Sequence, residues 1–335
     1  MNAYDKQYKA LTLRLGFALL FWFVLLQGSM TVLSIADLAL ASVLPEKISN
    51  LFYWGFYNVF YFASFMLPVP IFMLMSKKIP TQPMFFDLRL PRHFLLSCVA
   101  GVGMITAVGQ INSLLVAPFM GESNESTEML LELIKPGNGY MVVLVFVMLV
   151  IVPPICEEFL FRGLVLGNLL PYGKGVAIVG SALMFAAMHQ SYPQFLYTAM
   201  AGVLLGILYV KSRSIWPPTI LHMLNNLVSF VQMVIMARVS DEMLANRIMI
   251  AMNLLVMFAG LVAFAILVLL SKRKEKVQEI AVSAFGTTPE KEHFEQPIKL
   301  SDGMAVKGFF SPSIAVFICL SIVMAVFSLI MEHVA

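Results

Sequence analysis

The feature that most constrains this chain is a series of apolar runs, several of which reach the roughly 20 residues needed to cross the core of a bilayer. Charged residues make up only 12% of its 335 residues, against about 25% in ordinary soluble domains. Lipid offers no hydrogen bonds to a lone strand, so runs of this length must be helical. The sequence therefore predicts an all-α, polytopic transmembrane helical bundle of about eight or nine spans.

The candidate spans lie near 12–35, 51–75, 93–118, 140–163, 175–190, 194–210, 215–237, 247–271 and 312–332. This pattern divides the chain into 1–139 with three N-terminal helices and their loops, a helical core at 140–238, an eighth span within 239–271, a polar linker at 272–311 and a C-terminal span at 312–335.

Lysine and arginine are shared unevenly between the two sides of this arrangement. With a cytoplasmic N-terminus, the outer side holds only Lys47, Lys135, Arg238 and Arg247, and the inner side collects Lys6, Lys9, Arg14, Lys77, Lys78, Arg89, Arg92, Lys174, Lys211, Arg213, Lys272, Arg273, Lys274 and Lys276. Cytoplasmic loops of membrane proteins carry the excess of positive charge. We therefore expect an integral membrane protein with its N-terminus in the cytoplasm. The membrane that we expect is a bacterial plasma membrane.

Other features indicate little chemistry. Cys98, Cys156 and Cys319 show no CxxC spacing, which argues against a disulfide framework or a zinc finger. The net charge is +3, without a dense basic tract interleaved with aromatics outside the juxtamembrane clusters, so we expect no nucleic-acid partner. We interpret the aromatic-rich run at 51–62 as an interfacial belt and lipid-facing surface.

Polar residues inside the spans are concentrated in one part of the chain. An ionisable group at membrane depth costs ~3 kcal/mol on insertion scales, so it needs a partner or a function. Short connections make the three helices concerned neighbours. They carry Glu157, Glu158 and Arg162 in the fourth span, His189 at the end of the fifth, and His222, Asn225 and Asn226 in the seventh.

Helical spacing assigns the first roles. Glu158 and Arg162 are four residues apart and can form an ion pair on one face. Glu157 lies about 100° around the helix, is left without a local cation, and suits a general base that activates water. The Glu158–Arg162 pair can also be only a buried structural pair.

The later helices carry possible hydrogen-bond donors. His222 and Asn226 share one helix face and can donate to a developing oxyanion, whereas His189 can hold or polarise the water. His222 and Asn226 can instead form interhelical hydrogen bonds that only hold the bundle together, and this is the interpretation that we favour for Asn225. His189 can likewise be a packed histidine.

Depth along the helices leaves one conflict. At 1.5 Å per residue, His189 lies about 22 Å from Lys174, too far from the inner face to meet Glu158 if its helix is straight and begins at the surface. Either 164–174 enters the membrane or this helix is steeply tilted.

The three motifs resemble one known family. Glu157-Glu158-Phe159-Leu160-Phe161-Arg162 fits its EExxxR motif, Phe185 to His189 its FxxxH motif, and His222 to Asn226 its HxxxN motif. These motifs, in this order, are typical of the CAAX prenyl protease and bacteriocin-processing (CPBP, Abi-type) intramembrane glutamic endopeptidases. The resemblance covers about 150–230.

This resemblance implies a hydrolase that needs no cofactor and cleaves a peptide or protein substrate, which can be lipidated as in a prenylated CAAX-like sequence. It implies that Glu157 and His189 activate water, that Glu158 pairs with Arg162, and that His222 and Asn226 form the oxyanion site. We expect the cavity to open toward the cytoplasm.

Two other classes stay open. A zinc-dependent membrane metallopeptidase can use His189, His222 and a glutamate as ligands, although the sequence has no HExxH motif. The same bundle can also belong to a non-catalytic scaffold, an immunity-type protein or a transporter. An inverted-repeat transporter shows broken helices in both halves, however, and the polar residues of this chain are concentrated in one part.

Overall fold

The computed structural model describes residues 2–78, 81–82, 84–88, 90–116, 130–285 and 298–334, with side chains left out at 116, 274–285 and 331–334. Arg89, which was counted on the inner side, lies outside the described residues. Within the described ranges all regular structure is helical, and eight helices are long and apolar enough to cross a bilayer. The predicted all-α polytopic bundle is confirmed.

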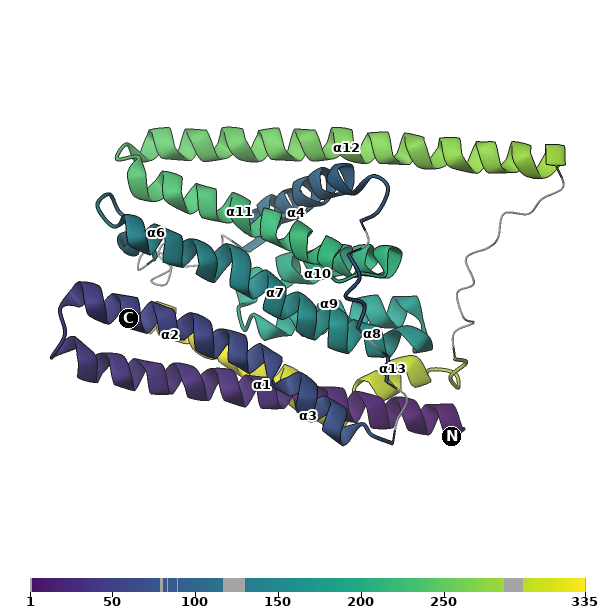
Figure 1. The fold of residues 1–335 in the computed structure, drawn as a ribbon, viewed down its shortest axis with the longest axis horizontal. Helices are drawn as coiled ribbons and strands as arrows, with labels where there is room; N and C mark the ends of the chain where they lie inside the picture. The colour runs from purple at the N-terminus through teal and green to yellow at the C-terminus, as the bar shows by residue number, and fades with distance from the viewer. Residues whose placement is uncertain are drawn as a thin grey trace.

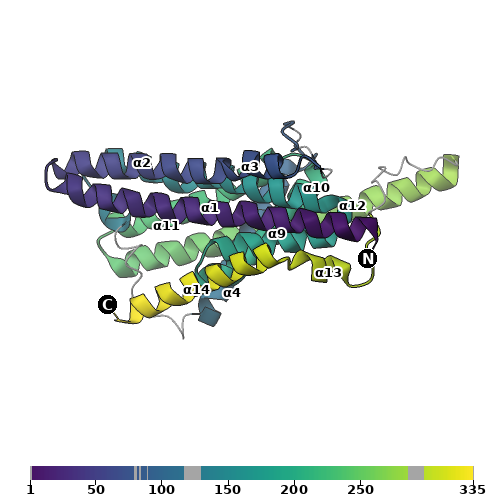
Figure 2. The same ribbon diagram turned by 90° about the horizontal axis from the view of Figure 1, so that it is seen from below.

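The helices follow the predicted order. They are α1 (Ala3–Ala41), α2 (Glu46–Met66), α3 (Pro68–Met75), α4 (Phe94–Val116), α6 (Gly139–Phe146), η2 (Val147–Ile151), α7 (Val152–Glu158), η3 (Phe159–Leu166), α8 (Gly167–Leu169), η4 (Leu170–Tyr172), α9 (Lys174–Met188), α10 (Tyr192–Ser212), α11 (Trp216–Arg238), α12 (Glu242–Phe285), α13 (Met304–Phe309) and α14 (Pro312–Val334). Two views show most of the long helices side by side along one axis, with the N and C marks toward opposite ends (Figures 1 and 2).

The fifth predicted span is short. It corresponds to α9, whose 15 residues extend over about 22 Å, less than the roughly 30 Å of a hydrocarbon core. The helix is nevertheless buried in the bundle, with Ala182, Met184 and Phe185 almost inaccessible. Protein therefore covers much of α9, although Val179 is exposed.

A continuous helical hairpin resolves the conflict over depth. The fourth span does not end at 163, because helix continues to Tyr172 and α9 begins directly after Gly173. Gly173 has φ = +133°, a conformation that side chains other than glycine rarely adopt. Glu157 and His189 are each 16 residues from Gly173 (173 − 157 and 189 − 173). The antiparallel arms of the hairpin therefore bring them to similar heights.

The predicted linker at 272–311 begins too early. Helix α12 continues to Phe285 and projects beyond its neighbours (Figure 1). The later part of the segment packs on α1, since Tyr8 and Thr12 donate hydrogen bonds of 2.9 and 2.7 Å to the carbonyls of Ala305 and Gly308. Ser301 donates through its backbone and its hydroxyl to the carboxylate of Asp5, at 3.0 and 2.6 Å.

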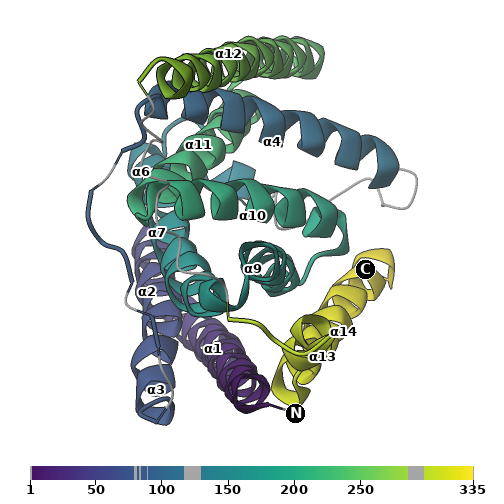
Figure 3. The ribbon, with the colours of Figure 1, turned by 90° about the vertical axis from the view of Figure 1, so that its right-hand side faces the viewer.

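Helices α4 and α12 pack closely at one edge of the bundle (Figure 3). A Cβ atom added to Gly103 would lie 2.5 Å from the Cα of Gly260, so only glycine allows the two backbones to approach this far. Small residues commonly allow such approaches between membrane helices, where van der Waals packing replaces the hydrophobic effect.

We predict that Gly103→Ala destabilises the protein by about 1–3 kcal/mol, because the new methyl group must separate two backbones. Thermal unfolding in detergent measures the effect. Gly28→Ala is the matched control, since a Cβ atom at Gly28 of α1 meets nothing within 4 Å. Equal unfolding temperatures for the two variants would contradict the close approach of α4 and α12.

Candidate active site

The carboxylate of Glu158 is the centre of a buried polar cluster. Its Oε1 atom lies 3.0 Å from Arg162 Nη1 and 3.0 Å from His222 Nδ1. The side chains of Glu158 and Arg162 are both fully buried, and the ion pair expected from their spacing is present. Because the ionised carboxylate only accepts, Nδ1 of His222 carries the hydrogen that it donates. Two helices are therefore joined through one carboxylate.

Arg162 is held from two further sides. Its Nη2 donates to the backbone carbonyl of Gly202 in α10 at 3.2 Å, and its guanidinium lies 4.6 Å from the ring centre of Phe185 in α9. Phe185 also presents its ring to His189 and His222, with centroids 4.8 and 5.8 Å apart. The phenylalanine of the second motif thus packs against Arg162 and against both histidines.

Glu157 has a different environment from its neighbour. Its Oε1 atom accepts a hydrogen bond of 2.7 Å from the hydroxyl of Tyr61 in α2. Its Oε2 atom is buried, has no hydrogen-bond partner among the described residues, and lies 3.7 Å from His222 Nε2. No lysine or arginine of the described residues pairs with it, so this carboxylate keeps one oxygen available for another donor.

The tautomer of His189 follows from its position at the end of α9. Its backbone N–H bonds to Ala186, which leaves the carbonyl of Phe185 to accept from His189 Nδ1 at 2.8 Å. A carbonyl only accepts, so Nδ1 carries the hydrogen, and Nε2 of the neutral ring is left as an acceptor. His189 can therefore take a hydrogen bond from a water molecule.

Asn226 is oriented by a break in the fourth span. Pro153 has no N–H with which to bond the carbonyl of Leu149, four residues earlier. Asn226 Nδ2 donates to that carbonyl at 2.9 Å, next to the π-helical segment η2. One of its two amide hydrogens is used in this way, and the other remains for a ligand. The neighbouring Asn225 exchanges hydrogen bonds of 2.8 and 3.2 Å with Tyr197 of α10, in agreement with the interhelical role predicted for it.

A cavity of about 680 Å³ adjoins these groups. Of the six predicted site residues it is lined by Glu157, His189, His222 and Asn226, whereas Glu158 and Arg162 lie behind the wall. Most of the remaining wall is apolar or aromatic, from Trp54, Tyr57, Tyr61, Ile105, Leu130, Met148, Leu149, Pro153, Phe185, Ala201 and Leu205. Among the described residues, no three His, Cys, Asp or Glu side chains are grouped so that they could hold a metal ion.

The cavity extends toward one end of the bundle. Trp54, Leu130 and Met148 of its wall come from the half that contains the α1–α2 connection, opposite the N-terminus (Figure 1). The predicted cytoplasmic N-terminus and the predicted cytoplasmic opening of the cavity both stay predictions.

The aromatic run at 51–62 is only in part the lipid-facing surface that we predicted. Phe52, Phe56 and Phe62 are exposed, but Trp54 is buried, and Tyr57 and Tyr61 line the cavity. Trp54, Tyr57 and Tyr61 are spaced by three and four residues and therefore share one helix face. This spacing was the signal in the sequence that could have placed Tyr61 beside a site.

The comparisons with known proteins agree with the motifs. Residues 139–228 match the family described as type II CAAX prenyl endopeptidase Rce1-like. YdiL of Bacillus subtilis (strain 168), named provisionally as a membrane peptidase, is 33% identical over 111 residues, which cover 32% of this chain and 42% of that protein. No solved structure matches the chain. The resemblance predicted from the three motifs is confirmed over the helices that carry them, and the match spans less than half of the relative's length.

We predict that Arg162→Met lowers the free energy of unfolding by about 3–5 kcal/mol, because it leaves the fully buried Glu158 carboxylate without its cation. The double variant with Glu158→Gln removes that charge and should recover part of the loss. Thermal unfolding in detergent measures both. The pairing would be contradicted if the free energy of unfolding of Arg162→Met lay within about 1 kcal/mol of the wild-type value, which is the range of an ordinary surface substitution.

Proposed function

We propose that this chain is an intramembrane endopeptidase of the glutamate type, in which Glu157 activates a water molecule. One observation carries the proposal: the available oxygen of Glu157 and the accepting nitrogen of His189 belong to the wall of the same cavity, in an apolar bundle. Two acceptors can hold one water molecule by its two hydrogens and orient its oxygen toward a substrate carbonyl.

In the proposed reaction the water oxygen attacks the carbonyl carbon of the scissile peptide bond, and its proton passes to Glu157. The electron pair of the carbonyl moves onto oxygen. When the tetrahedral intermediate collapses, the C–N bond breaks and the leaving nitrogen takes the proton from Glu157. The products are a carboxylic acid and an amine, without a covalent bond to the protein.

The oxyanion is proposed to form beside Asn226 and His222. Asn226 contributes the amide hydrogen that Leu149 does not use. Since Nδ1 of His222 donates to Glu158, its Nε2 can donate to an oxyanion only when the ring is protonated. Preorganised donors of this kind typically contribute about 2.7–4 kcal/mol each to catalysis.

The substrate is proposed to be a peptide with an apolar or lipidated segment. The aromatic and aliphatic residues that make up most of the wall suit apolar groups, and the proposed catalytic groups line the same cavity. A prenylated, CAAX-like peptide fits this division, and so does an unmodified hydrophobic peptide. A panel of farnesylated and unmodified peptides in reconstituted membranes separates the two.

We predict that Glu157→Gln abolishes cleavage of this panel, because an amide cannot take the proton of water, while addition of a chelator leaves the wild type active. Product formation is measured by mass spectrometry. Glu132→Gln is the matched control, since Glu132 is exposed and forms a surface ion pair with Lys135.

Loss of wild-type cleavage on chelation would replace this mechanism with that of a metallopeptidase. If a folded, monodisperse protein cuts no member of the panel, the proposal fails in favour of a non-catalytic scaffold.

We predict that Tyr61→Phe lowers kcat by about ten- to a hundredfold with KM unchanged, because a hydrogen bond to a charged group contributes about 1.5–3 kcal/mol. The hydroxyl donates to Glu157 Oε1, and its proposed role is to position this carboxylate. Tyr53→Phe, on the same helix but outside the cavity wall, is the control. An equal loss in both variants, or a rise in KM alone, would remove Tyr61 from the reaction.

A further inference from the structure

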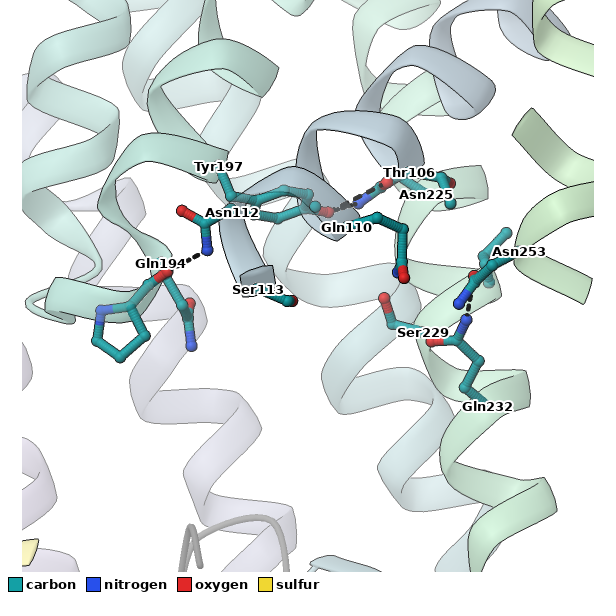
Figure 4. Close-up of a pocket in the computed structure, with 13 residues that line it drawn as sticks. Thr106, Gln110, Asn112, Ser113, Gln194, Tyr197, Asn225, Ser229, Gln232 and Asn253 are labelled. Carbon is teal, nitrogen blue, oxygen red and sulfur yellow. Dashed lines mark hydrogen bonds between the residues drawn. The ribbon is translucent and has the colours of Figure 1, made fainter. Parts of the chain in front are cut away.

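A second pocket of about 460 Å³ lies beside the cavity, between α4, α10, α11 and α12 (Figure 4). It differs from the cavity in chemistry. Ten of its lining side chains are amides or hydroxyls and none is charged: Thr106, Gln110, Asn112, Ser113, Gln194, Tyr197, Asn225, Ser229, Gln232 and Asn253. The three remaining lining residues are Gly109, Pro193 and Val228.

Hydrocarbon cannot satisfy these groups. Gln110, Ser113 and Gln194 are exposed, although they belong to helices long enough to cross a bilayer. Deeper in the wall, Asn112 is only 7% accessible and donates to the carbonyl of Pro193, yet its Oδ1 atom is buried without a hydrogen-bond partner among the described residues. A buried amide oxygen left unpaired costs about 1–3 kcal/mol. The pocket therefore requires a ligand that donates hydrogen bonds.

The pocket and the cavity share a wall. Gln194, Tyr197, Asn225 and Ser229 line both. Tyr197 and Asn225 are hydrogen-bonded to each other across this wall (Figure 4), and Asn225 also donates to Asn226 Oδ1 at 3.3 Å. A continuous series of polar groups thus leads from the mouth of the pocket to the residue proposed to bind the oxyanion.

We propose that this polar pocket holds water and delivers it to Glu157 past the Tyr197–Asn225 pair while substrate fills the main cavity. The delivery role rests on the proposed function. A hydrolase consumes one water per bond cut, and an apolar substrate in the cavity excludes water from that side. A separate polar route then supplies the nucleophile.

The lining favours water over other ligands. A phosphate or carboxylate would need a cation, and the wall has none. An apolar group would leave the amides and hydroxyls unpaired, which is costly. Water both donates and accepts, and a buried water molecule typically makes about three hydrogen bonds. Peptide main chain is the competing ligand, and it predicts a different kinetic result.

The first test measures hydration without requiring activity. We expect Thr106→Cys to react with a charged methanethiosulfonate reagent at least about tenfold faster than Met104→Cys, because only a hydrated thiol ionises readily. Met104 is the matched control, exposed on the same helix but outside the pocket. Both changes are made in a background without Cys98, Cys156 and Cys319. Equal rates would overturn the proposal, whether or not the protein is a peptidase.

The second test concerns delivery. We expect Gln110→Leu, which makes the mouth apolar, to lower kcat by about tenfold with KM unchanged, since 1.36 kcal/mol on the barrier is tenfold in rate. Ile111→Leu is the control at the neighbouring position. A rise in KM for longer peptides would instead make the pocket a subsite for peptide main chain, and unchanged kinetics would show that no water passes through it. Either result overturns the proposal.

Discussion

The rest of the site depends on one buried carboxylate, that of Glu158, which forms an ion pair with Arg162 on its own helix and accepts a hydrogen bond from His222 on α11. A charge at this depth is tolerated only when it is paired and hydrogen-bonded. Both partners are therefore fixed in place, and each in turn fixes something else. Arg162 reaches the carbonyl of Gly202, which ties α10 to the cluster, and His222 turns its second nitrogen toward Glu157.

This arrangement separates two adjacent glutamates by function. A step of one residue, about 100° around the helix, places Glu158 beside Arg162 behind the wall, while Glu157 lines the cavity and accepts from Tyr61. Each carboxylate has one buried oxygen without a hydrogen-bond partner among the described residues, but only that of Glu157 belongs to a residue of the cavity wall. In our account Glu158 holds the helices together and Glu157 reacts with water. Pro153 adds to the same geometry, since the carbonyl it leaves free orients Asn226.

Much of this could be predicted from the sequence, for physical reasons. The apolar runs specify helices. Because residues four apart on a helix share a face, the ion pair between Glu158 and Arg162 could be predicted from their spacing. Contacts between distant helices could not be derived in this way. Nothing in the sequence joins Tyr61 to Glu157 or His222 to Glu158, because neither spacing nor composition fixes how α2 and α11 rotate about their axes. The depth of His189 was left between two alternatives, because polar and apolar composition alone does not reveal that helix continues through 164–172.

The division between the two glutamates is tested most directly by thermal unfolding of Glu157→Gln and Glu158→Gln, two isosteric changes at adjacent positions. Our account predicts that Glu158→Gln lowers the free energy of unfolding by about 3–5 kcal/mol, because it leaves the Arg162 charge buried and unpaired. Glu157→Gln should stay within about 1 kcal/mol of the wild type. Equal losses, or a larger loss for Glu157→Gln, would contradict the account.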